Sequence, residues 1–115
     1  MVGITREGIQ TANLVDATRR EVKRYAGYSP LAKLYPILDD DNQTYAVIII
    51  EDDPAARPAY ALVMARVGGD KIVIEEDRSF DKPLYQALMS NAGIPREQII
   101  LAYAGESLPP ETDSK

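Results

Sequence analysis

The chain has 115 residues, of which 45% are apolar and 27% charged, with a formal net charge of -5 and neither Cys nor His. The apolar content excludes a wholly disordered chain and predicts a single domain, over residues 1–106. Two prolines and polar residues predict a flexible tail over residues 107–115. The missing residue types exclude disulfides, thiolate zinc sites and His-dependent catalysis, so we predict no metal and no cofactor. The negative charge disfavours direct binding to nucleic acid.

The first predicted element is a helix over residues 9–26, because apolar residues such as Val15 and Val22 recur at helical spacing. Gly27 is predicted to end it in the left-handed conformation. The adjoining helix face is basic, and it is either a solvated surface or a docking patch for an acidic partner or a phosphate backbone. Four residues form this patch: Arg19, Arg20, Lys23 and Arg24.

Four strands are predicted next, over residues 35–38, 45–50, 60–67 and 71–75. An acidic hairpin tip joins the first pair, a loop with two prolines follows, and a Gly68-Gly69-Asp70 turn joins the last pair. The continuous apolar run over residues 45–50 predicts a central strand covered on both faces. Alternation predicts which side chains face the helices: Leu62, Met64, Ile72 and Ile74.

The last predicted elements are a helix that starts at Pro83 and a strand over residues 99–103. Gly93 is predicted to end this helix in the left-handed conformation, with Pro95 preventing its continuation. The predicted fold is α+β: an N-terminal helix, a mostly antiparallel four-stranded sheet, a second helix and a final strand, with both helices on one sheet face. The other face is apolar, which predicts a homo-oligomer.

Membrane insertion and secretion are not expected. The longest uninterrupted apolar run, residues 46–50, is too short to span a bilayer, and residues 1–8 lack the apolar core of a signal peptide. Together with the missing Cys, this predicts a cytoplasmic protein of bacterial type.

Three acidic clusters, at residues 39–41, 51–53 and 75–77, lie at predicted strand ends. Grouped carboxylates can hold magnesium, so a metal-dependent nuclease is one possible function. A nuclease core of the restriction type needs a Lys two residues after an acid on a strand, whereas the triplet Glu21-Val22-Lys23 falls on a helix. Charged loops that keep the domain soluble are the simpler interpretation. The seven tyrosines serve either as partly buried packing or at an interface, and a small-molecule binding module is a further alternative.

Two blocks of the chain resemble the XisI family of element excision controlling factors. The first block is GDKIVIEED, over residues 69–77, and the second is AGIPREQIILAY, over residues 92–103. The chain departs from the family pattern in lacking its Gly-Trp segment, and Arg78 stands where a Gly is common. The resemblance implies a regulatory protein that acts with a nuclease-like companion, XisH, and it supplies no catalytic residues.

These observations together predict a non-enzymatic accessory protein that controls excision of a DNA element through an XisH-like, nuclease- or recombinase-like partner. An acidic surface could occupy a basic groove of that partner by mimicking a phosphate backbone. The residues expected to do so are Glu51, Asp52 and Asp53.

Overall fold

The computed structural model describes residues 10–53, 55 and 59–107, and it contains one sheet and two α-helices over these residues. The elements in chain order are α1 (Thr11–Lys23), β1 (Ala32–Asp39), β2 (Thr44–Glu51), β3 (Tyr60–Gly68), β4 (Lys71–Asp77), α2 (Leu84–Ala92), the 3-10 helix η2 (Arg96–Gln98), β5 (Ile99–Leu101) and the 3-10 helix η3 (Ala102–Ala104). The α+β prediction is confirmed.

The strands lie in the order β1-β2-β3-β4-β5. Neighbours from β1 to β4 are antiparallel, and β5 lies parallel to β4, as expected for a strand that follows a helical crossover. The final strand therefore joins the same sheet, which has five strands rather than four.

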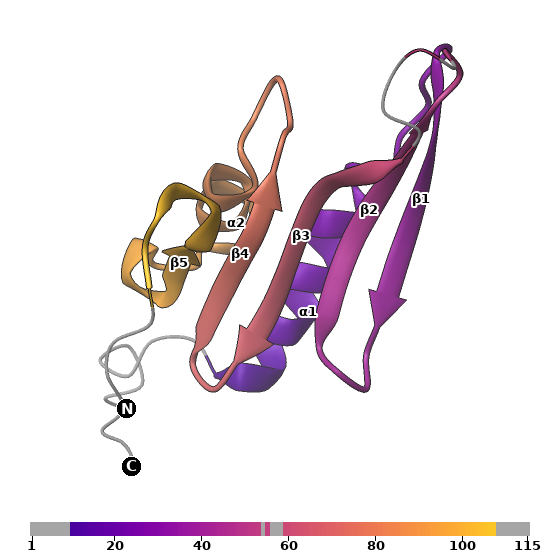
Figure 1. The fold of residues 1–115 in the computed structure, drawn as a ribbon. Helices are drawn as coiled ribbons and strands as arrows, with labels where there is room; N and C mark the ends of the chain where they lie inside the picture. The colour runs from indigo at the N-terminus through magenta and orange to yellow at the C-terminus, as the bar shows by residue number, and fades with distance from the viewer. Residues whose placement is uncertain (1–9, 54, 56–58, 108–115) are drawn as a thin grey trace.

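Both helices cover the same face of the sheet, as predicted, so the domain has two layers (Figure 1). The core lies between them, and its largest fully buried side chains include Leu14, Tyr45, Ile72, Ile74 and Leu88. The opposite sheet face carries no other element among the described residues (Figure 1). In the same part of the chain, no helix is long and apolar enough to cross a membrane.

The end of α2 follows the predicted pattern. Gly93 has a φ of 69°, and its N–H donates to the Met89 carbonyl at 3.1 Å. The N–H of Ile94 donates to the Leu88 carbonyl at 3.2 Å, and the Ile94 side chain is buried in the core. These are the bonds of a left-handed helix end closed by an apolar contact.

The end of α1 differs from the prediction. The helix ends at Lys23, and Gly27 is not among the residues with positive φ. The N–H groups of Tyr25 and Ala26 donate to the carbonyls three residues earlier, both at 3.0 Å. These bonds tighten the last turn and satisfy its carbonyls, so no left-handed residue is needed.

The prediction that Met64 faces the helices was wrong. The pairing of β3 with β2 passes from Val63 opposite Val47 to Ala61 opposite Ile48, which leaves Leu62 as an extra residue. Leu62 and Val63 both pack with the core, and Met64 faces the open side. A bulge of this kind breaks the simple alternation on which the prediction depended.

The first strand is longer than predicted, and the last is shorter. β1 begins at Ala32 within the expected connection, whereas β5 ends at Leu101 and continues as η3. β2 is paired on both edges, but the predicted cover on both of its faces is not found among the described residues, where α1 packs on one face.

Candidate functional site

A cleft of about 660 Å³ opens between the end of α1, the connection from α1 to β1, and the segment before α2. Sheet residues that face the helix layer, Leu34, Ile49 and Leu62, contribute its apolar wall. The remaining lining residues are Glu21, Arg24, Tyr25, Tyr28, Ser29, Ser79, Phe80, Asp81, Lys82, Ala87 and Asn91. The volume falls within the range of natural ligand sites, so this cleft is the candidate functional site.

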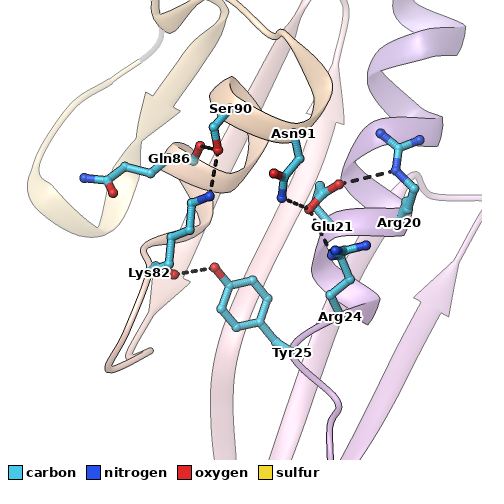
Figure 2. A network of polar contacts seen from close by, with 8 residues as sticks. All are labelled: Arg20, Glu21, Arg24, Tyr25, Lys82, Gln86, Ser90 and Asn91. Carbon is cyan, nitrogen blue, oxygen red and sulfur yellow. Dashed lines mark hydrogen bonds and ion pairs between the residues drawn. The ribbon is translucent and has the colours of Figure 1, made fainter.

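A buried carboxylate lies at the cleft. Glu21 is only 1% exposed, and Asn91 Nδ2 on α2 donates to its Oε1 at 3.0 Å. Arg20 Nε donates to Oε2 at 3.3 Å, and Arg24 Nε lies 3.6 Å from Oε1 (Figure 2). A buried charge is tolerated when opposite charges and donors compensate its lost hydration. Glu21 therefore joins α1 to α2 and holds Arg24 at the cleft.

The sequence carries a signal for the burial of Glu21 that the spacing of apolar residues alone does not show. Glu21 lies seven residues after Leu14, so two helical turns place it on the same buried stripe. A carboxylate at such a position needs a partner inside the fold.

Tyr25, just after α1, forms a second set of polar contacts with the segment before α2. Its hydroxyl donates to the Lys82 carbonyl, and Lys82 Nζ donates to Ser90 Oγ at 2.7 Å (Figure 2). Burial, followed by the negative charges of Asp77 and Glu21, raises the pKa of Tyr25 to about 12. The phenol therefore stays protonated at neutral pH and keeps the segment before α2 attached to α1.

Two aromatic side chains border the cleft in nearly full contact with solvent. Tyr28 is 91% exposed and Phe80 is 95% exposed. They are far apart in sequence, so only the tertiary fold brings them to one cleft, and no local pattern could have predicted the pair. Exposed aromatic surface beside a cleft is typical of a docking site, because burying it in a complex is favourable.

The acidic cluster at residues 75–77 has a structural role. Asp77 Oδ2 accepts from the Leu84 N–H at the start of α2 at 2.7 Å, and Oδ1 accepts from the Ser79 N–H at 2.9 Å. Glu75 pairs with Arg66 at 2.7 Å, and Glu76 lies 3.3 Å from Arg78 Nε. Among the described residues, no three acidic side chains gather as metal ligands would.

The predicted basic patch is brought together along a shallow groove of about 500 Å³ on α1, which Asp16 also lines. Most of its charges are already paired within the chain. Arg19 Nε lies 3.2 Å from Asp40 Oδ1, and Arg20 NH1 lies 3.7 Å from Asp16 Oδ2. Lys23 is exposed and forms no ion pair in the described part of the chain. Of the four, Arg24 alone also lines the cleft.

The predicted acidic patch lies where β2 ends. Glu51 Oε2 accepts from the Tyr60 hydroxyl at 2.9 Å, and Asp53 Oδ1 accepts from the Ala55 N–H at 2.9 Å. Asp52 borders a hollow of about 480 Å³ that Tyr28 also lines. Tyr28 thus belongs to both depressions, and it connects the acidic patch to the cleft. Much of the remaining loop, residues 54 and 56–58, lies outside the described residues.

The fold and the cleft define a two-layer α+β domain with an aromatic-rimmed cleft in its helix layer. No protein-family model matches the chain, and no curated protein sequence matches it.

Similarity to known proteins comes from solved structures. A XisI-like protein from Anabaena variabilis ATCC 29413 aligns with 80% of this chain and 85% of its own, at 18% identity and a TM-score of 0.68. The fdxN element excision controlling factor XisI from the same organism aligns with 80% of this chain and 90% of its own, at 23% identity and a TM-score of 0.65. The chain therefore has the fold of XisI-like proteins, and the resemblance seen in the sequence is confirmed for the fold.

Proposed function

We propose that the chain is a non-enzymatic, cytoplasmic accessory protein of the XisI type that controls excision of a DNA element by binding an XisH-like, nuclease- or recombinase-like partner. The observation that carries this proposal is the fold shared with a protein named as an excision controlling factor, over 80% of the chain. Fold alone does not imply function, so the surface of this chain has to supply a matching site.

The cleft and the acidic patch supply such a surface. Tyr28 and Phe80 offer the exposed aromatic area that forms hot spots when a partner buries it. Glu51, Asp52 and Asp53 add negative charge where β2 ends, and Asp52 lines the hollow that Tyr28 also lines. Negative charge there suits the basic groove of a DNA-processing protein. The partner therefore contacts both, with an apolar anchor in the cleft and cations over the acidic patch.

The polar groups near the cleft support a binding role because they are committed to the fold. Glu21 and Asp77 are held by donors within the chain. Ser79 Oγ donates to Asp77, and Ser90 Oγ donates to the Gln86 carbonyl. A nucleophile needs a base in hydrogen-bond contact that is free to accept its proton, and these side chains instead close internal bonds.

The experiment is co-expression with the XisH-like protein of the same genome, followed by affinity capture and an excision assay on a plasmid that carries the element. The triple variant Glu51→Lys, Asp52→Lys, Asp53→Lys is expected to lose capture and to change the excision frequency. Glu97→Lys is the matched control, because Glu97 is exposed on η2 away from both surfaces. Capture of the triple variant at the wild-type level would contradict the acidic contact, and absence of capture for the wild type would contradict the proposal.

The cleft also favours a second candidate, a small-molecule binding module. Its volume of about 660 Å³ and its largely apolar wall suit a drug-sized ligand. A thermal-shift screen of metabolites tests this function: a hit should raise the melting temperature of the wild type and lose its effect in Phe80→Ala. A screen without hits, together with capture of the XisH-like protein, would favour the accessory role over the small-molecule binding module.

A further inference from the structure

The open sheet face carries an apolar patch over β1 and β2, here called the sheet patch. Its members are Tyr35, Ile37, Ile48 and Ile50. Alternation along each strand directs them away from the helices, since Leu34, Leu38 and Val47 pack with the core. Tyr35 is 45% exposed, Ile37 50% and Ile50 40%. A contiguous apolar patch of this kind marks an interaction surface.

We propose that the sheet patch packs against the same patch of a second copy of this chain, around a twofold axis that passes over β1 at the level of Pro36. The axis lies between the two sheets and perpendicular to their strands, so β1 of one copy runs antiparallel over β1 of the other. Residues at equal distances from Pro36 then meet. Tyr35 faces Ile37 of the second copy, and Lys33 faces Asp39 of the second copy.

The charges at the two ends of β1 fit this arrangement. Lys33 and Asp39 share the open face with the sheet patch, and the residues between them in β1 are uncharged. Hydrogen bonds from the Asn42 side chain and N–H hold the pKa of Asp39 below its usual range, so this carboxylate is ionised at neutral pH. The twofold axis forms the Lys33–Asp39 pair twice, with apolar contacts between.

The size of the face is also suitable for self-association. The four long strands, β1 to β4, are seven to nine residues long. At about 4.8 Å between strands and about 3.3 Å per residue, they give a face of about 19 Å by 26 Å, or about 500 Å² in projection. A standard interface buries about 800 Å² of accessible surface on each side, and protruding side chains exceed their projected area. Two such sheets pack about 10 Å apart, as in a sandwich.

Pairing along the free edge of β1 is disfavoured by Pro36. The Leu31 carbonyl accepts from the Asp52 N–H at 3.0 Å, so alternate residues from Leu31 onward direct their backbone groups toward β2. Pro36 is five residues further on, and its nitrogen therefore faces the free edge with no N–H to donate. Face-to-face packing remains as the way to cover the sheet patch.

The first test is sedimentation velocity at micromolar concentration. The wild type is expected to sediment as a dimer, and Ile37→Lys and Ile50→Lys as monomers. Met89→Lys is the matched control, because Met89 is 38% exposed on α2, on the opposite layer, and this variant should stay dimeric. Circular dichroism checks that each variant is folded. A monomeric wild type would overturn the proposal. A dimeric Ile50→Lys would also overturn it, since edge pairing leaves that side chain outside the interface.

A charge swap tests the twofold axis itself. Lys33→Glu is expected to weaken dimerisation about tenfold, because it places two carboxylates together at each end of β1. Adding Asp39→Lys to this variant should restore the dimer, since the swapped charges again meet across the axis. Failure of the double variant to recover, while it remains folded, would contradict the axis. If an XisH-like protein binds the sheet patch and the free chain is monomeric, the patch serves that partner and the proposal is wrong.

Discussion

At the scale of single residues, the acidic side chains divide into structural and exposed groups. Asp77 and Glu21 bind donors inside the fold, whereas Asp52 and Asp53 are exposed after the end of β2. Sequence patterns cannot separate the two groups, because carboxylates that cap a helix and carboxylates that face a partner are the same chemical group. Only the fold shows which donors lie within reach.

Replacing Asp77 by Ala should lower the free energy of unfolding by about 1–2 kcal/mol, because it removes the side-chain acceptor at the start of α2. Urea denaturation measures the change. Asp81→Ala is the matched control in the same segment, since Asp81 is exposed, and it should stay within about 0.5 kcal/mol of the wild type. Equal stability of the two variants would show that Asp77 does not cap α2.

The raised pKa values of two tyrosines predict that the protein loses stability at high pH. Burial is the main cause that raises the pKa of Tyr25 and of Tyr45 to about 12, from the ordinary value of 10.0. Each phenol therefore keeps its proton in the folded state at a pH where the unfolded chain has lost it. Their contribution is fully present below pH 10 and falls as the pH rises toward about 12.

Urea midpoints measured at intervals from pH 9 to pH 12 test this behaviour. The wild type should lose stability steadily above pH 10, and the double variant Tyr25→Phe, Tyr45→Phe should lose less over the same interval. Parallel curves for the two proteins would indicate that other groups cause the loss.

At the scale of elements, helix ends are decided by backbone geometry as well as by residue type. Gly93 and Gly27 each follow a helix in the sequence, yet only Gly93 has a positive φ. The two glycines therefore make a matched pair, because a Cβ at either position would meet no atom within 4 Å.

Gly93→Ala is expected to destabilise the fold by about 1 kcal/mol, because a side chain is strained in the left-handed conformation. Gly27→Ala should be neutral or slightly stabilising, since it reduces the freedom of the unfolded chain at no steric cost. Thermal unfolding compares the two. A similar loss in both variants would contradict the helix ends described for α1 and α2.

The sequence predicted the elements with strong local signals. The apolar run that became β2 and the Gly93-Ile94-Pro95 stop were confirmed, as were the turn before β4 and the final strand. The start of β1 and the side of Met64 were missed, because an edge strand containing Pro36 and a bulge at Leu62 both disturb the period on which strand prediction depends.

The candidate site was less predictable than the fold. Arg24 was singled out as part of a basic helix face, but its position at the cleft depends on Glu21 and Asn91. Phe80 carried no sequence signal. Sites made by side chains from distant elements depend on the tertiary fold, and local periodicity does not encode such contacts.

At the scale of the whole molecule, the cleft and the sheet patch lie on opposite sides of the sheet, whereas the hollow beside Asp52 is lined by Tyr35 of the sheet patch as well as by Tyr28. The cleft is in the helix layer, and the sheet patch is on the sheet face that the helices do not cover. Self-association therefore leaves the cleft free, and a dimer would present two clefts to a partner. Two sites on one particle raise the effective concentration for a dimeric or DNA-bound partner.

Isothermal titration calorimetry of the purified XisH-like protein against this chain tests the central claim that the protein acts by binding through its cleft. The wild type should bind, and Phe80→Ala should bind at least about tenfold more weakly, because an exposed aromatic anchor is lost without harm to the core. Met89→Ala, an exposed apolar change outside the cleft, should bind like the wild type. Equal affinities for all three proteins, or no binding by the wild type, would contradict it.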